Sequence, residues 1–107
     1  MNTKPFVVIL FLLVLSVSLE AATYYSINSS NLSVTTNWKT GTDGSGTSPA
    51  NFTNTADIFI VQTGHSCTLG SDVTFAGAFV LNGTASLNMN GYALTVGSSS
   101  KRKFNNN

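Results

Sequence analysis

Hydrophobic residues are unevenly distributed along this chain of 107 residues. Phe6–Leu15 is an unbroken apolar run, whereas the residues after position 22 carry only short apolar clusters separated by polar residues. In that second region the apolar positions do not recur at the three- and four-residue spacing of a helix. The pattern therefore predicts an apolar leader followed by a domain of short β-strands and turns.

The leader, residues 1–22, has the layout of a secretory signal peptide. Lys4 supplies a positive charge before the apolar run, and small residues follow it at Ser18, Ala21 and Ala22. The run is shorter than the roughly 20 apolar residues that a membrane-spanning helix needs. We therefore expect a signal helix that is cut after Ser18, Ala21 or Ala22, with an uncleaved membrane anchor as the alternative. The prediction is a secreted or cell-surface protein with no membrane contact after cleavage.

The strands predicted from the apolar clusters are three to five residues long. Gly41, Gly44, Gly46 and Pro49 make residues 39–51 a loop. Ile58–Val61 is apolar on consecutive positions, which is typical of a strand buried on both faces. The predicted strands cover residues 24–27, 32–35, 58–61, 66–69, 73–75, 78–81, 85–87 and 93–96.

Glycines divide the second half of the chain at almost regular intervals. They stand at positions 64, 70, 77, 83, 91 and 97, and each interval holds one short strand. Glycine permits the positive φ of tight turns, and Asn82-Gly83 and Asn90-Gly91 are hairpin-type turn signals. Such spacing suits a hairpin meander, a sandwich or a parallel β-solenoid. The very short strands and the Ser, Thr and Asn residues between them favour an all-β fold over residues 23–97. We predict the start of a right-handed parallel β-solenoid, with a small β-sandwich as the alternative.

The composition excludes several classes of protein. Only 8% of the residues are charged and the net charge is +1, so the chain lacks the basic surface of a nucleic-acid-binding protein and the charged periodic helices of a coiled coil. The single cysteine excludes an intramolecular disulfide framework and a cysteine-based zinc site. We predict no cofactor and no nucleic-acid partner.

A family resemblance rests on the order of several short motifs, namely Trp38, Pro49, residues 56–60, residues 64–69, residues 81–88 and residues 91–96. This order resembles the N-terminal region of secreted β-helix surface proteins of Bacteroidetes-type bacteria, and it is similar to the eight-glycine domain of extracellular proteins. The resemblance implies a cell-surface location and roles in adhesion or carbohydrate binding. Some relatives carry polysaccharide lyase or hydrolase modules further along the chain.

Few residues offer catalytic chemistry. His65 is the only histidine, and a general base needs a partner. Asp43, Asp57 and Asp72 include a possible acid/base pair of the glycosidase type, although Asp57 and Asp72 are also placed to cap turns. Asp43-Gly44-Ser45-Gly46 lacks the other acidic positions of a calcium loop. Cys67 alternates with polar neighbours and is expected to point inward. We therefore predict no catalytic residue and no metal site.

Trp38 and Tyr92 are the residues predicted to contact a ligand, because aromatic ring faces suit the apolar faces of sugars. Core packing is the alternative for Trp38. The predicted function is a secreted structural or binding module, adhesin-like or carbohydrate-contacting, whose partner is an extracellular polysaccharide or cell-surface glycan. The alternative is the N-terminal fragment of a polysaccharide lyase or hydrolase. Residues 98–107 are expected to be a disordered tail, and the β-coils are expected to continue in a longer protein.

Overall fold

The computed structural model describes residues 20–97, and this part of the chain is mostly β-structure without an α-helix. Of the signal peptide predicted over residues 1–22, residues 1–19 lie outside the described residues, and so does the tail predicted over residues 98–107. The elements are β1 (Thr23–Ser26), the 3-10 turn η1 (Thr35–Asn37), β2 (Trp38–Lys39), β3 (Ile58–Val61), β4 (Ser66–Thr68), β5 (Val73–Phe75), β6 (Ala78–Leu81), β7 (Ser86–Asn88) and β8 (Leu94–Val96).

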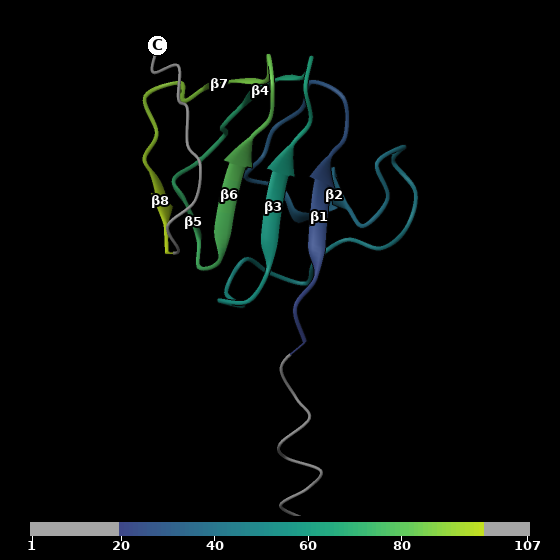
Figure 1. Cartoon of the computed structure of the whole chain (residues 1–107). Helices are drawn as coiled ribbons and strands as arrows, with labels where there is room; N and C mark the ends of the chain where they lie inside the picture. The colour runs from purple at the N-terminus through teal and green to yellow at the C-terminus, as the bar shows by residue number, and fades with distance from the viewer. Residues whose placement is uncertain (1–19, 98–107) are drawn as a thin grey trace, which may run out of the picture.

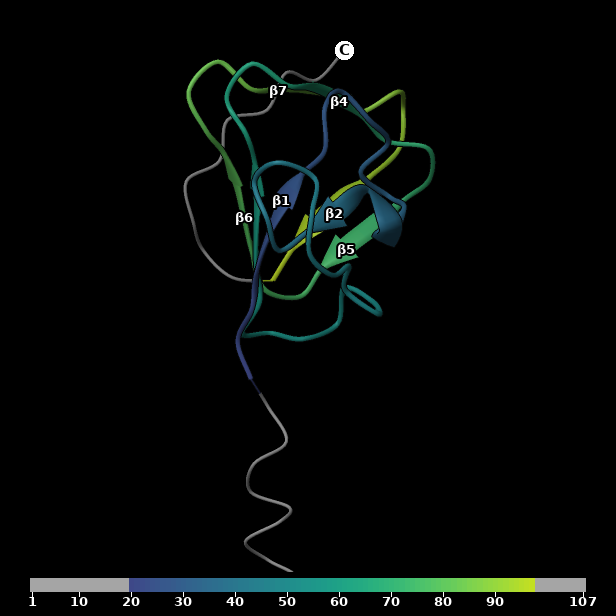
Figure 2. The same ribbon diagram turned by 90° about the vertical axis from the view of Figure 1, so that its right-hand side faces the viewer.

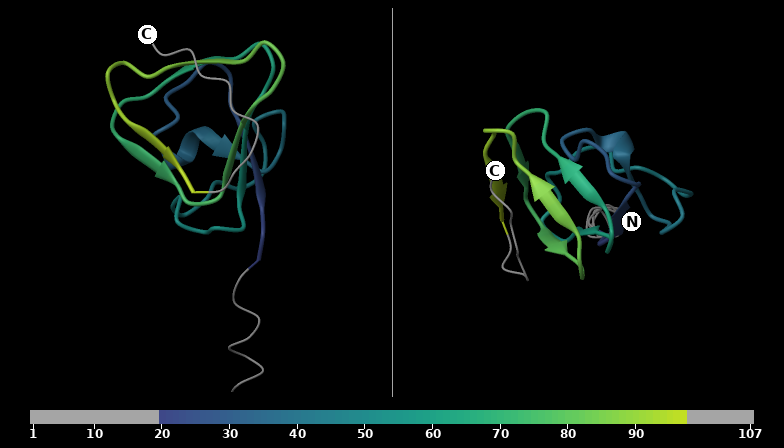
Figure 3. Two further views of the ribbon diagram at one scale, coloured as in Figure 1. Left: turned by 60° about the vertical axis from the view of Figure 1, so that its left-hand side comes forward. Right: turned by 90° about the horizontal axis from the view of Figure 1, so that it is seen from above.

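The strands form three small sheets, and nearly all of their pairings are parallel. The largest sheet has the order β2-β1-β3-β6, and the other two consist of β4-β7 and β5-β8 (Figure 1). Ile58 pairs with Ala78, and Ser66 pairs with Ser86 in the same parallel sense. The chain thus returns to the same sheet after 20 residues on these two sides and after 21 on the third. The views in Figures 2 and 3 show the sheets arranged around a common interior.

Alternation along each strand decides which side chains enter that interior. Phe59 and Val61 are buried and pair with Phe79 and Leu81 on β6, so inward side chains lie above one another in successive strands. Ile58 is 37% exposed because it points to the opposite face of the sheet. The prediction that Ile58–Val61 is buried on both faces is therefore wrong. Only one face of this sheet is covered.

The edge of β1 is covered by a segment that the sequence did not mark as a strand. Trp38 and Lys39 form β2, which pairs antiparallel with β1. The predicted strand over residues 32–35 is absent, because the chain bends there into η1 after a single parallel bridge between Asn31 and Thr68. This bend returns Trp38 to the hydrophobic core. We call this side of the molecule, comprising β1, β2 and residues 35–56, the β1 end.

The regularly spaced glycines serve two different purposes. Gly64 has a φ of +85° with open space at its Cβ position, as the turn prediction requires. Gly77 instead lies so close to the preceding coil of chain that a Cβ would meet the Asp57 carbonyl oxygen at 2.0 Å. Asn82-Gly83 does not form a hairpin, since it joins β6 and β7, which belong to different sheets. Some of the regularly spaced glycines are thus required by close packing between neighbouring segments of the chain and not by a turn.

Polar side chains connect successive turns of the chain outside the core. The hydroxyl groups of Thr63 and Thr84 lie 3.1 Å apart, and the Thr63 hydroxyl accepts from the Thr84 amide at 3.0 Å. The Asn90 side-chain amide donates to the Leu69 carbonyl at 3.0 Å. These contacts join residues 21 positions apart, which is close to the interval of 20 or 21 residues between paired strands on the three sides. Ser, Thr and Asn side chains therefore connect segments of the chain that lie side by side.

Candidate binding surface

The outward face of the largest sheet carries two rows of side chains that run across three strands. We call it the outer sheet face, and its members share outward orientation and parallel register: Thr23, Ile58 and Ala78 in one row, and Tyr25, Ile60 and Val80 in the other. The side chains that alternate with them contact the core. This face is largely apolar although it faces solvent. Contiguous apolar surface of that kind is characteristic of interaction sites.

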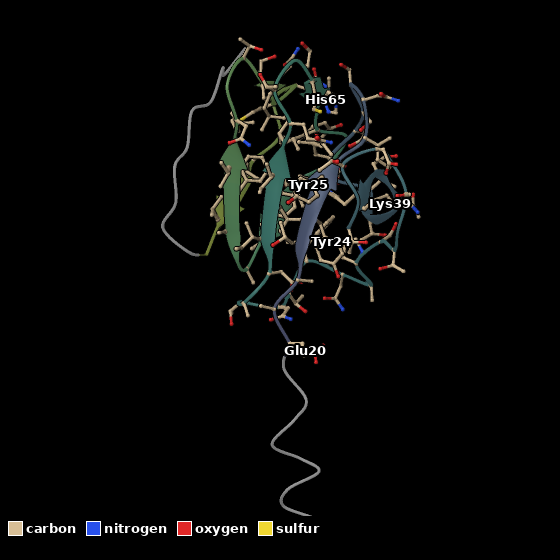
Figure 4. The ribbon with its side chains drawn as sticks, turned by 45° about the vertical axis from the view of Figure 1, so that its right-hand side comes forward. Glu20, Tyr24, Tyr25, Lys39 and His65 are labelled. Carbon is tan, nitrogen blue, oxygen red and sulfur yellow. The ribbon has the colours of Figure 1, made fainter. Side chains whose placement is uncertain are left out.

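Tyr25 and Lys39 give the outer sheet face its polar groups. Lys39 of β2 pairs with Tyr25 of β1, so the ammonium-bearing side chain and the phenol ring come from adjacent strand positions (Figure 4). Tyr25 pairs on its other side with Ile60 of β3. An aromatic ring is thus flanked by a cationic side chain and an aliphatic one. Such a group of side chains offers an apolar surface together with hydrogen-bond donors.

The two aromatic residues predicted to contact a ligand lie in very different environments. Trp38 is 0% exposed, and its indole N–H donates to the Leu32 carbonyl at 3.0 Å. Its ring meets Phe59 edge-on at a centroid distance of 5.1 Å and Phe75 at 5.6 Å. No face of Trp38 is available for a sugar in this structure, so the core-packing alternative describes it. Tyr92 is 41% exposed, and it follows β7, away from the outer sheet face.

His65 has a partner that the sequence did not reveal. Its Nδ1 lies 2.8 Å from the hydroxyl oxygen of Ser26, a residue 39 positions earlier. The Ser26 hydroxyl also accepts from the Gln62 amide at 2.9 Å, and Ser26 is fully buried. The pair resembles a nucleophile and base, but the Ser26 oxygen has no exposed surface with which to reach a substrate. Its geometry serves to connect β1 with the turn after β3. Only the parallel pairing of β1 with β3 could have indicated this contact.

The three aspartates of the described residues each accept a hydrogen bond from a backbone amide. Asp57 Oδ1 accepts from Ala22 at 3.1 Å, and Asp72 Oδ1 accepts from Ala93 at 2.9 Å. Asp43 Oδ1 accepts from the hydroxyl and the amide of Ser45, and these bonds hold the pKa of Asp43 below its usual range. The capping alternative therefore describes Asp57 and Asp72. Asp43 caps its own loop in the same way.

Cys67 points inward, as predicted. It is 1% exposed and pairs in register with Leu87 of β7. Burial raises the pKa of the Cys67 thiol above its ordinary value. Because a thiol reacts as the thiolate, this position is unsuited to nucleophilic chemistry. The side chain acts as a small hydrophobic group in the core.

Comparison with other proteins adds no relative. No family model, curated protein sequence or solved structure matches the chain. Within residues 20–97, no cluster of three or more His, Cys, Asp or Glu side chains could hold a metal ion. None of these residues forms a helix with the length and hydropathy that crossing a membrane requires. The outer sheet face is therefore the candidate binding surface of the described residues.

Proposed function

We propose that residues 23–97 form the first coils of a right-handed parallel β-solenoid in a secreted or cell-surface protein. The proposed module binds extracellular polysaccharide or cell-surface glycan through the outer sheet face and has no catalysis of its own. Support for the solenoid comes from one parallel strand pairing on each of the three sides at an interval of 20 or 21 residues, although β1 and β3 pair at 35. Each interval corresponds to one coil, with a short strand on each side.

Support for further coils comes from the other end of the stack. Among residues 20–97, β6, β7 and β8 have a strand neighbour on one side only. We call this side the β6–β8 end. Leu94 and Val96, which belong to the last coil, are only partly buried although they pack against the core. An exposed strand edge with apolar residues beside it can pair with a further strand. The proposed next coil would pair with these edges and cover both side chains.

A crosslink tests the coil register that the solenoid requires. The hydroxyl groups of Thr63 and Thr84 are 3.1 Å apart, so cysteines at both positions should form a disulfide with little backbone movement. The experiment uses Thr63→Cys with Thr84→Cys in a Cys67→Ala background and measures free thiols after mild oxidation. We expect complete intramolecular crosslinking, and a pairing of Thr63→Cys with Asn90→Cys serves as the mismatched control. Free thiols in the Thr63/Thr84 variant, or equal crosslinking in the control, would contradict the register.

The observation that carries the binding proposal is the row Tyr25–Ile60–Val80 on the solvent side of the sheet. A pyranose has an apolar face of C–H groups and a rim of hydroxyls. The Tyr25 ring and its aliphatic neighbours suit the first, and the Tyr25 hydroxyl and Lys39 suit the second. The low charge of the module is consistent with a neutral or weakly acidic glycan.

A glycan array with the exported protein tests this function. For the glycans retained, titration with Tyr25→Ala should give at least a roughly 10-fold weaker Kd, since the ring face would be removed. Tyr92→Ala is the matched control, because it deletes an equally large exposed aromatic side chain elsewhere. Absence of binding to every glycan would refute the proposed function. Loss of binding in Tyr92→Ala but not in Tyr25→Ala would refute the outer sheet face as the site.

A further inference from the structure

Asp57 is a buried carboxylate whose observed side-chain partner is a backbone amide. It is 5% exposed, and its Oδ1 accepts from the Ala22 amide at 3.1 Å. Its backbone is held firmly, because the Asp57 amide donates to Asn54 and its carbonyl accepts from Ala78. Lys39 and His65 are the only basic side chains in residues 20–97. His65 follows the opposite end of β3, and Lys39 pairs with Tyr25, three positions beyond Ala22.

A buried carboxylate is costly unless a positive charge or several hydrogen bonds compensate for its lost hydration. Asp57 also lies near the phenol of Tyr24, whose pKa is raised by burial first and by the negative charge of Asp57 second. A cation at the Ala22 nitrogen would compensate for this charge directly. The nitrogen of Ala22 becomes a cation when the peptide bond that precedes it is hydrolysed.

The fold discriminates among the three cleavage positions that the sequence allows. Ala22 belongs to the domain, because its carbonyl accepts from the Ile58 amide at 2.9 Å and extends the β1–β3 pairing. A cut after Ala22 would remove this acceptor and the partner of Asp57. Ala21 is exposed, and among the described residues a cut after it would remove the hydrogen bond from the Asn54 side-chain amide to the Glu20 carbonyl at 3.0 Å. A cut after Ser18 would leave three residues attached and the Ala22 nitrogen uncharged.

We infer that the chain is processed between Ala21 and Ala22, and that the new α-ammonium of Ala22 forms a buried ion pair with Asp57. This inference rests on the proposed export of the protein. Hydrolysis adds one water to the Ala21–Ala22 peptide bond, catalysed by the signal peptidase of the exporting cell. The C–N bond breaks, a carboxylate leaves with Ala21, and the amine that remains on Ala22 takes up a proton. The existing hydrogen bond from the Ala22 nitrogen to Asp57 then joins two ionised groups, which strengthens it.

The processing site is tested by expressing the full chain in a bacterium and sequencing the N-terminus of the exported protein, with its intact mass as confirmation. We expect a single N-terminus at Ala22. An exported protein that begins at Leu19 or Thr23 would overturn the inference and leave export itself intact. A chain that keeps residues 1–21 and stays in the cell would overturn the proposed export and the inference together.

The ion pair is tested on the processed protein by following the Ala22 α-proton in NMR spectra as the pH is raised. The pKa of the Ala22 α-amine should lie above the ordinary range of about 7.7–8.0 and should return to it in Asp57→Asn. Asp72→Asn is the matched control, because Asp72 accepts from the Ala93 amide in the same manner, elsewhere in the fold. An ordinary pKa in the unmutated protein, or an equal change in Asp72→Asn, would overturn the ion pair. The unmutated titration is informative even where Asp57→Asn fails to fold.

Discussion

At the β1 end of the molecule, a strand and a large aromatic ring cover the stack, whereas the β6–β8 end has neither among residues 20–97. Trp38 of β2 is fully buried there, and the half-buried Phe52 packs its ring against Phe75 at a centroid distance of 4.7 Å. At the opposite end, Leu94 and Val96 of β8 are partly exposed, although Phe79 of β6 and Leu87 of β7 are fully buried. The two ends are built from the same kinds of short strand, so the difference comes from the irregular segment, residues 35–56.

This difference shows how one end of the stacked strands is covered. A parallel coil leaves hydrogen-bonding groups and core side chains uncovered on its outer side, and a cap must provide for both. At the β1 end, β2 satisfies backbone groups of β1 through antiparallel pairing, while the Trp38 ring packs within the core against Phe59. The cap and the coils therefore depend on different sequence features, which mutations can separate.

The largest effect is expected from Trp38→Ala. Removing a fully buried indole and its hydrogen bond to Leu32 should lower the free energy of unfolding by about 3–5 kcal/mol. The matched change at the other end is Val96→Ala, which should cost only about 1 kcal/mol because Val96 is half-buried. Urea unfolding followed by circular dichroism measures both, since Trp38 is the only tryptophan and fluorescence would be lost. If the two costs were equal, the β1 end would not be the better-closed one.

The next largest effect is expected at one of two glycines that lie close to backbone carbonyl groups. A Cβ on Gly77 would lie 2.0 Å from the Asp57 carbonyl oxygen, inside the stack, so Gly77→Ala should cost about 2–3 kcal/mol. A Cβ on Gly97 would lie 2.2 Å from the Ala76 carbonyl oxygen, but there β8 pairs on one side only and can move outward. Gly97→Ala should therefore cost less than about 1 kcal/mol.

The same urea unfolding experiment compares the two glycine variants. Equal destabilisation would mean that the β6–β8 end is held as rigidly as the interior. Such a result would indicate that another layer covers this end in the protein.

The sequence predicted most strands but not the cap. Ile58–Val61, Val73–Phe75 and Ala78–Leu81 were placed correctly, because each is a short apolar cluster between turn residues. Trp38 and Lys39 do not form a strand through their own propensity. They pair with β1 because the bend at residues 35–37 returns the chain to its edge. Nothing local in the sequence specifies that return.

The candidate site was predictable only in part. Tyr25 lies in the strand predicted over residues 24–27 but is not among the predicted ligand contacts. Its neighbours Ile60 and Val80 belong to two other predicted strands, and the first of these was expected to be buried on both faces. Their common surface depends on the parallel register of β1, β3 and β6, which joins residues 35 and 20 positions apart in the chain. Register of this kind is a tertiary property, and the alternation within one strand cannot supply it.

Cys67 lies in the core between the two ends, and its contribution to the pH dependence of unfolding tests whether that part of the core is closed. The expected effect on the free energy of unfolding is smaller than those above. Burial raises the pKa of its thiol, so the unfolded state loses this proton first as the pH rises. The free energy of unfolding should therefore fall once the pH passes the ordinary thiol pKa of about 8.5, by at most about 1.4 kcal/mol per pH unit. Cys67→Ala should lack this contribution in urea unfolding between pH 8 and 9.5. A pH dependence identical in both proteins would mean that the thiol is accessible, and hence that the core between the ends is open.

The smallest effect is expected from Asp43→Asn, in the loop of the β1 end. The hydrogen bonds from the Ser45 hydroxyl at 2.5 Å and the Ser45 amide lower the pKa of Asp43 in the folded state. Their contribution is present above the ordinary pKa of about 3.9 and is lost as the pH falls through the lower, folded-state pKa. Because these bonds span only two residues of an exposed loop, Asp43→Asn should change Tm at pH 7 by no more than about 2 °C. Thermal melts at pH 7 and pH 3 measure this. A drop at pH 7 comparable to that of Trp38→Ala would mean that the loop, rather than the buried indole, closes the β1 end.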